Sequence, residues 1–126
     1  MASRVRISVG DLSKTFRQGA REVPAVSAVS LDVHEREFVA IVGPSGCGKS
    51  TVLNMIGGLI APSAGEILVD GQPVLGAPPA TVGYVFQKDT VFPWRTVERN
   101  IALGLEYRNV PAAERAARVR EAIALA

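Results

Sequence analysis

The sequence is poor in the features that mark secreted, membrane-spanning or nucleic-acid-binding chains. It has one cysteine, Cys47, so no disulfide can form within the chain, which is typical of a reducing cytoplasm. A net charge of +2 with no basic run predicts no nucleic-acid partner. No stretch approaches the ~18 apolar residues of a membrane span. The first ten residues also lack the apolar core of a signal peptide.

Aromatic residues are few as well, at 6% of the chain, whereas apolar residues reach 48% and charged residues 21%. This balance is typical of a folded α/β domain rather than of a disordered or fibrous chain. A chain of 126 residues typically buries somewhat over about 60% of its unfolded surface on folding. We therefore expect one domain over residues 1–126 with a core of its own.

Strand patterns fill the first third of the chain. Apolar and polar residues alternate in Arg4–Val9 and again in Val29–His34, which predicts two half-exposed strands. The polar stretch Ser13–Pro24 between them predicts a loop or a hairpin connection. Phe38–Val42 is a continuous apolar run, which predicts a strand buried on both faces.

The middle of the chain alternates between helix and strand signals. A helix is expected over about Lys49–Leu59, closed by the Gly57-Gly58 pair and by Pro62. Gly65–Leu75 predicts a hairpin, because Asp70-Gly71 can supply the positive φ angles of a tight turn. Ala80–Gln87 predicts another apolar strand.

Two further helices are expected after a loop at Lys88–Arg95. The first begins near Thr96, whose hydroxyl can cap the helix. The second begins near Pro111, since proline favours the first helical turn. Large apolar residues in the loop are hard to explain unless something covers them, so we expect Trp94 to be at least partly exposed.

The turn between Phe38–Val42 and the next helix fits the phosphate-binding loop G-x-x-x-x-G-K-[ST] at every fixed position. Its glycines let successive N–H groups point inward, and the helix N-terminus adds partial positive charge. Lys49 is expected to reach the β- and γ-phosphates and Ser50 to bind Mg²⁺, while Cys47 offers its backbone N–H rather than a nucleophile. The predicted site for ATP and Mg²⁺ comprises Gly43, Pro44, Ser45, Gly46, Cys47, Gly48, Lys49, Ser50 and Thr51.

Beyond this loop, essentially the whole chain resembles the nucleotide-binding subunit of ABC transporters. The resemblance begins at LSKTF and continues through the P-loop and the hairpin to VGYVFQKDTVFPWRTVERNIALGLE. That order of aromatic residue, P-loop, hairpin and glutamine strand separates the chain from kinases and GTPases. The resemblance implies an α/β, RecA-like P-loop NTPase core with an N-terminal antiparallel β subdomain. The last segment is especially similar to importers of nitrate, sulfonate, taurine and bicarbonate.

The resemblance also implies roles for single residues. Phe16 stands at the family's adenine-stacking position, although it could instead plug the edge of a sheet. Gln87 stands where the family's glutamine contacts Mg²⁺ and the attacking water, although it could merely cap a strand. Ser50 and Gln87 are therefore the expected metal contacts. The surface that meets the permease is expected at Phe92, Pro93 and Trp94, which could otherwise be core residues.

Other parts of the family's machinery are not found in these 126 residues. The family places its Walker B strand, catalytic glutamate, signature loop and switch histidine after the glutamine strand. Ile67–Asp70 is an apolar run ending in aspartate, but Gly71 follows where a glutamate would stand, and His34 lies too early for the switch histidine. We therefore expect an N-terminal part of an ABC-type ATP-binding domain, truncated before the Walker B strand. Such a piece leaves Phe38–Val42 as an uncovered edge and binds ATP-Mg without turning it over.

The leading hypothesis is the ATP-binding subunit of an importer, cytoplasmic and peripheral on the inner face of the membrane. Its partners would be a permease and a second ATP-binding subunit. A small P-loop phosphotransferase is an alternative, but Arg95, Arg99 and Arg108 form no evident lid. A non-catalytic fragment that serves as an interaction piece is the third possibility.

Overall fold

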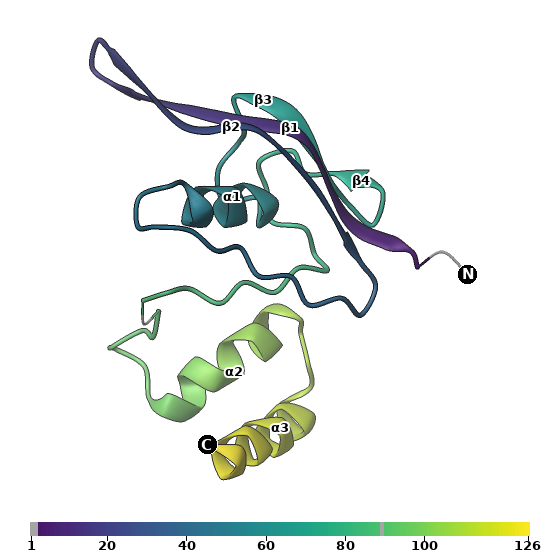
Figure 1. Cartoon of the computed structure of the whole chain (residues 1–126). Helices are drawn as coiled ribbons and strands as arrows, with labels where there is room; N and C mark the ends of the chain where they lie inside the picture. The colour runs from purple at the N-terminus through teal and green to yellow at the C-terminus, as the bar shows by residue number, and fades with distance from the viewer. Residues whose placement is uncertain (1–2, 89) are drawn as a thin grey trace. The chain divides into compact units, whose positions relative to one another are not determined.

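The structure is a computed structural model that describes residues 3–88 and 90–126. Within these residues it has four strands and three helices (Figure 1). The chain divides into two compact units, Met1–Tyr84 and Val85–Ala126, and each is described by itself.

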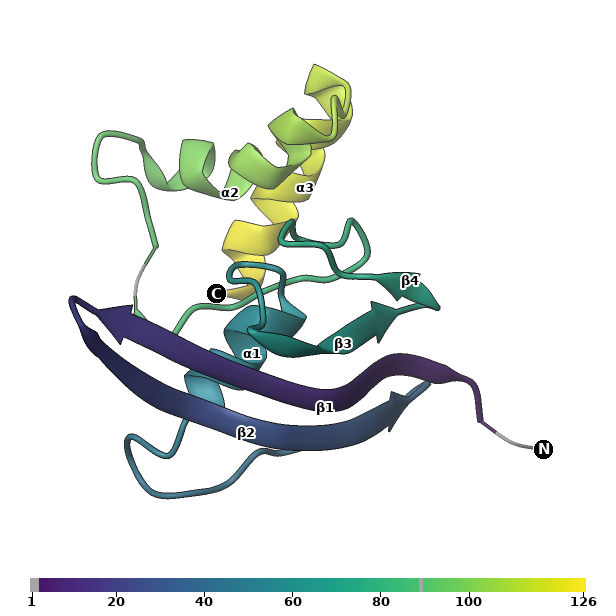
Figure 2. The ribbon, with the colours of Figure 1, turned by 90° about the horizontal axis from the view of Figure 1, so that it is seen from above.

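The first unit is built on a long antiparallel hairpin (Figure 2). Its arms are β1 (Val5–Gln18) and β2 (Arg21–His34). On the other side of β1 lies β3 (Ala64–Val69), and the short β4 (Gln72–Pro73) pairs with β3. The sheet order is β2-β1-β3-β4, with every pair antiparallel. This confirms the N-terminal antiparallel β subdomain.

Of the loop or hairpin connection predicted over Ser13–Pro24, the structure has the hairpin, and both of its arms run through this stretch. Phe16 pairs with Val23, and these two strand-forming side chains lie opposite each other across the ladder. Pro24 is tolerated because β2 is an edge strand of the sheet, where a missing N–H donor costs little. The turn itself is confined to Gly19 and Ala20.

A single helix, α1 (Lys49–Ile56), packs on this sheet (Figures 1 and 2). It ends at the predicted glycine pair, one turn earlier than Leu59. Met55 of α1 and Leu12 of β1 are completely buried at the centre of the core. The other buried members of this core are Val9, Val26, Val52, Ile56 and Ile67.

The predicted hairpin at Gly65–Leu75 is confirmed. Asp70 has φ 52° and Gly71 has φ 76°, the two positive angles that a tight turn between antiparallel strands requires. The Asp70 carboxylate forms an ion pair with Arg6 of β1 at 2.9 Å. Asp70 therefore lies in a turn that closes onto the neighbouring strand.

Two predicted strands are not found among the described residues. Phe38–Val42 belongs to no strand, and Phe38 is 93% and Val42 90% exposed. Residues 82–86 are also irregular, although the Tyr84 hydroxyl donates to the Asn54 side chain at 2.6 Å. A segment forms a β-strand only when its backbone hydrogen-bonds to a neighbouring strand. The four described strands pair only with one another, so these two segments have no strand beside them. The two apolar runs indicate a propensity for strand formation, but they do not show whether a neighbouring strand is present to pair with them.

The second unit is a pair of helices, α2 (Val97–Tyr107) and α3 (Ala112–Leu125). Thr96 caps α2 as predicted, because its hydroxyl accepts a hydrogen bond from the Arg99 N–H at 3.3 Å. The predicted start of a helix at Pro111 is also confirmed. Ala102 and Val119 are buried in this unit. Among the described residues, no helix is long and apolar enough to cross a membrane.

Candidate functional site

The predicted phosphate loop is a tight turn seated on β2. Gly46 and Gly48 have φ angles of 80° and 86°, a region that residues with a side chain rarely adopt. The Cys47 N–H donates to the Pro44 carbonyl at 3.3 Å, which closes the turn. A Cβ at Gly48 would overlap the carbonyl oxygen of Ala25 in β2. Glycine is therefore required at this position by conformation and by space.

The loop presents free hydrogen-bond donors. In the described chain, the N–H groups of Ser45, Gly46 and Gly48 donate no hydrogen bond. The first N–H groups of α1 have no helical carbonyl one turn earlier to bond. Unpaired N–H donors in a glycine-rich turn at the start of a helix fit an anion, and phosphate above all.

Lys49 supplies a positive charge at the same place. Its ammonium donates to the carbonyl oxygens of Gly43 at 2.8 Å and Pro44 at 3.0 Å, and lies 3.9 Å from the Cys47 sulfur. In the described residues no carboxylate pairs with it. Ser50, in the first turn of α1, is exposed. The loop, its lysine and this hydroxyl fit a phosphate with a bound Mg²⁺.

A pocket of about 310 Å³ opens beside the loop. Its walls are mostly apolar, and a concave apolar wall with a few polar groups is typical of a ligand site. Phe16 does not line it. The lining residues are Ala25, Val26, Ser27, Val29, Leu31, Ile41, Val42, Cys47, Gly48, Lys49 and Val52.

Gln87 and the predicted permease-contact residues belong to the second unit. Gln87 is exposed in a bend before the loop that leads to α2. Trp94 is 76% exposed, which confirms the expectation that it is at least partly exposed. Its ring packs against Phe92, with centroids 5.1 Å apart and an interplanar angle of 56°. The two rings form one apolar surface in the loop that precedes α2 in the sequence.

Asn100 holds this loop in place, and the sequence reasoning missed it. Its side-chain oxygen accepts a hydrogen bond from the Phe92 N–H at 2.8 Å. The signal that could have revealed it was an asparagine inside a predicted helix, because an asparagine side chain there usually competes for the backbone hydrogen bonds of the helix. Its amide nitrogen lies 3.0–3.1 Å from the carbonyl oxygens of Phe92, Arg95 and Thr96.

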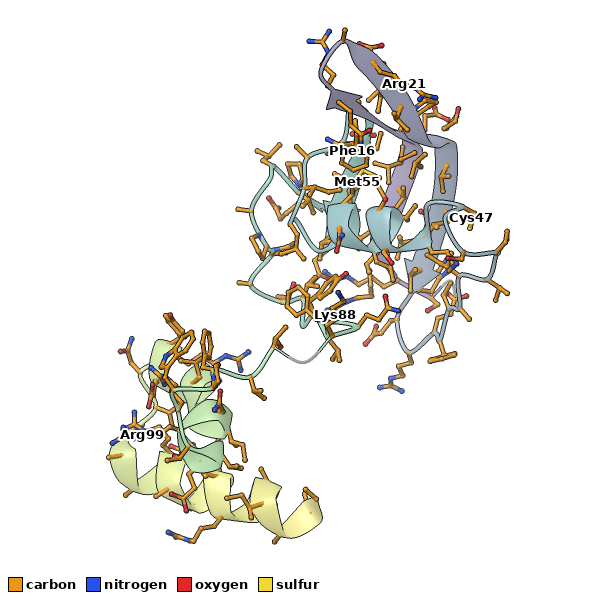
Figure 3. The ribbon with its side chains drawn as sticks, turned by 90° about the vertical axis from the view of Figure 1, so that its left-hand side faces the viewer. Phe16, Arg21, Cys47, Met55, Lys88 and Arg99 are labelled. Carbon is orange, nitrogen blue, oxygen red and sulfur yellow. The ribbon has the colours of Figure 1, made fainter. Side chains whose placement is uncertain are left out.

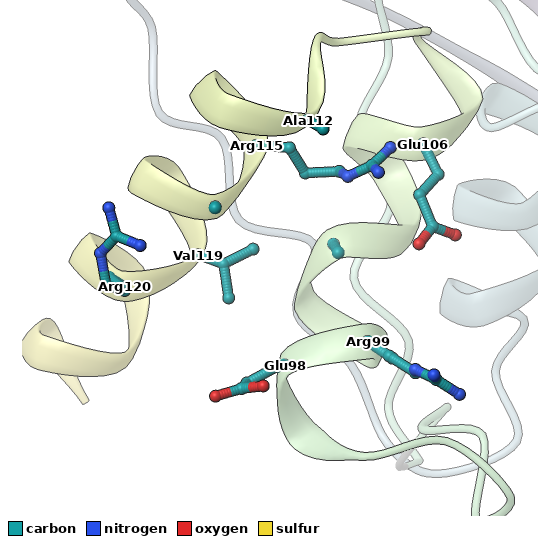
Figure 4. Close-up of a pocket in the computed structure, with 9 residues that line it drawn as sticks. Glu98, Arg99, Glu106, Ala112, Arg115, Val119 and Arg120 are labelled. Atoms are coloured by element: carbon teal, nitrogen blue, oxygen red, sulfur yellow. The ribbon is translucent and has the colours of Figure 1, made fainter.

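A second pocket, of about 400 Å³, lies between α2 and α3 (Figure 4). Its apolar part comprises Ala102, Ala112, Ala116 and Val119, and side chains of both charges surround it. In residues 3–88 and 90–126, no group of three or more His, Cys, Asp or Glu side chains could hold a metal ion. The charged lining residues are Glu98, Arg99, Glu106, Arg115 and Arg120.

Comparison with known proteins decides the family. The family described as ABC transporter matches residues 26–126, which contain the phosphate loop and both helices of the second unit. The chain belongs to the ABC transporter family.

Two ABC import proteins are similar to the chain in sequence. It is 47% identical to the taurine import ATP-binding protein TauB of Pseudomonas putida, over 82% of this chain and 39% of that protein. It is 42% identical to the spermidine/putrescine import ATP-binding protein PotA of Thermobifida fusca, over 94% of this chain and 32% of that protein. The chain thus spans between about a third and two fifths of these ABC relatives.

A solved ABC structure is similar in fold. The ATP-binding cassette MJ0796, in a dimeric post-hydrolysis state bound to ADP and Pi, superposes with a TM-score of 0.81 at 32% identity. The match covers 91% of this chain and 54% of that one. This likeness confirms the α/β, P-loop NTPase architecture that the sequence predicted.

Proposed function

We propose that this chain binds ATP through residues 43–51 and is part of the ATP-binding subunit of an ABC importer. The observation that carries the proposal is the turn of free N–H donors around Lys49, a cation with no carboxylate partner in the described chain. The similar MJ0796 cassette holds ADP and Pi, the same chemical class of ligand.

The residues of the loop have separate tasks in this proposal. Lys49 exchanges its two carbonyl partners for oxygens of the β- and γ-phosphates, and the loop N–H groups surround the same phosphates. The Ser50 hydroxyl, in the first turn of α1, is the Mg²⁺ contact that the loop itself offers in this proposal. The metal, when bound, neutralises charge on the phosphates.

The relatives support a role in import, but they do not agree on a single transported solute. TauB and PotA are both import proteins, and the chain is 47% and 42% identical to them although their names give different solutes. The taurine protein agrees with the resemblance of the Val85–Glu106 segment to importers of nitrate, sulfonate, taurine and bicarbonate. We therefore propose an importer and leave its solute open.

The proposed permease contact is the Phe92–Trp94 surface. Trp94 is exposed and packs on Phe92, and Asn100 ties the backbone beneath them to α2. A rigid aromatic surface of this kind is what a partner helix can bury with little loss of side-chain freedom. Such docking would hold the chain at the inner face of the membrane, with a second ATP-binding subunit in the same assembly.

Thermal unfolding with and without Mg-ATP tests the nucleotide proposal. At a hundredfold excess over its dissociation constant, the ligand stabilises the folded state by about 2.7 kcal/mol, a shift of several degrees in melting temperature. Lys49→Ala is expected to remove most of this shift. Arg21→Ala is the matched control, because it deletes a positive charge at the hairpin tip, well apart from Cys47 (Figure 3). A folded wild-type chain with no shift, or an equal loss in both variants, contradicts the proposal.

A further inference from the structure

One face of the Phe16 ring lies against a cation. The ammonium of Lys14 is 5.3 Å from the ring centroid, within the range of a cation–π interaction. The same ammonium donates a hydrogen bond of 2.6 Å to the carbonyl oxygen of Ala61, in the loop after α1. Lys14 therefore fixes the ring of Phe16 against a segment outside its own strand.

Phe16 also lies close to the phosphate loop along the hairpin. It pairs with Val23, and two residues further along β2 the carbonyl of Ala25 touches Gly48. At a rise of about 3.3 Å per residue, this is roughly 7 Å along the hairpin plus one strand spacing of about 5 Å. A phosphate in the loop thus has the base of its nucleotide within reach of Phe16.

The exposed part of the Phe16 ring is available for a nucleotide base to stack on. Phe16 is 38% exposed, although it lies in the middle of a paired stretch of β1. An aromatic ring offers two faces for stacking, and an ammonium held by a backbone carbonyl occupies one of them. A base can then stack only on the other face, against a ring whose orientation is already set.

We propose, on the basis of the nucleotide function proposed above, that Lys14 is a positioning residue for Phe16. It holds the ring by one face so that the purine base of the bound nucleotide stacks on the opposite face. Lys14 acts through Phe16 and touches neither the base nor the phosphates.

The competing explanation is that Lys14 only ties β1 to the loop after α1 through Ala61. In that case its loss weakens the fold, and with it the binding of any ligand of the loop, whether or not the ligand has a base. Base-dependent affinity therefore separates the two explanations.

The experiment compares the dissociation constants of Mg-ATP and of inorganic tripolyphosphate, which has the phosphates without the base. Lys14→Met keeps the apolar stem and removes the cation, whereas Lys14→Arg keeps a cation. We expect Lys14→Met to weaken ATP about two- to fivefold, the size of an exposed cation–π contribution, and to leave tripolyphosphate unchanged. We expect Lys14→Arg to retain most of the wild-type affinity for ATP.

A double-mutant cycle with Phe16→Leu checks that the effect passes through the ring. In the Phe16→Leu background, Lys14→Met is expected to change the ratio of the two dissociation constants no further. Equal weakening of both ligands by Lys14→Met, or no change in their ratio, overturns the role of Lys14 while the nucleotide proposal stands. If neither ligand binds in a way that depends on Lys49, the nucleotide proposal fails, and the role of Lys14 fails with it.

Discussion

Gly48 and Ala25 meet through their backbones, so closely that a side chain on Gly48 would overlap the Ala25 carbonyl. The contact joins the end of the phosphate loop to the middle of β2. Phe38–Val42, part of the segment that links β2 to the phosphate loop, is irregular and exposed. The loop is therefore positioned by a contact across space rather than by the chain that leads into it.

Two alanine substitutions in the loop distinguish the cost of steric overlap from the cost of an unfavourable backbone conformation. Gly46→Ala is expected to cost about 1–2 kcal/mol, because its φ of 80° is unfavourable for alanine although the space around it is open. Gly48→Ala is expected to cost roughly 1–3 kcal/mol more, because its Cβ would displace β2 as well. Urea unfolding of both variants measures the difference. Equal losses would show that the contact with Ala25 yields easily.

Asn100→Asp is expected to loosen the loop that carries Trp94. An aspartate keeps the shape but replaces the amide donor, which lies within 3.1 Å of three carbonyl oxygens, by a carboxylate. We expect a loss of about 1–3 kcal/mol in unfolding free energy. Trp94 is the only tryptophan, so its fluorescence anisotropy reports the loop directly and should fall.

Asn109→Asp is the control for this substitution. Asn109 is exposed in the turn after α2, with a φ of 54° that aspartate also tolerates. We expect a change within about 0.5 kcal/mol. If the two aspartates have equal effects on stability and anisotropy, the bonds of Asn100 do not hold the loop.

The acid side of the stability profile is expected to depend on Glu37. The backbone N–H of His34, and next its ring, lower the pKa of the Glu37 carboxyl below its ordinary value. The contribution of Glu37 to stability is then present above its unfolded pKa and is lost as the pH falls through the lowered folded pKa. His34→Ala leaves the backbone bond in place, so the pKa should rise only part of the way back. Carboxyl NMR titration measures it, and an unchanged titration contradicts the contribution of the ring.

The polypeptide of residues 1–126 is expected to hold ATP without hydrolysing it. Gln87, the residue expected at the attacking water, carries a neutral amide that cannot accept a proton as a carboxylate does. Phosphate release should therefore match that of Lys49→Ala. A wild-type rate about tenfold above that variant, a difference of about 1.4 kcal/mol in barrier, would show that another residue acts as the base.

Features set by neighbours in sequence were predicted well. The Asp70-Gly71 turn, the Thr96 cap and the glycines of the phosphate loop depend on a few adjacent residues, and the structure has each of them. Backbone conformation and capping are local chemistry, so a short window of sequence contains the information.

Features set by distant partners were not predicted. Phe38–Val42 has the composition of a buried strand, but composition does not supply a neighbouring strand. The contact of Ala25 with Gly48 and that of Lys14 with Ala61 each join segments more than twenty residues apart. Such contacts leave no periodic mark in the sequence, because each depends on one residue at each end.

The two carbonyl partners of Lys49 have a consequence for which anions the loop can retain. An arriving anion must displace the carbonyls of Gly43 and Pro44 from the ammonium before it gains that charge for itself. A single monovalent ion such as chloride offers one charged atom in exchange, whereas a polyphosphate offers several charged oxygens to the ammonium and to the free N–H groups at once. The carbonyl oxygens of Gly43 and Pro44 thus compete with any anion for the Lys49 ammonium, which favours ligands that bring several charged oxygens.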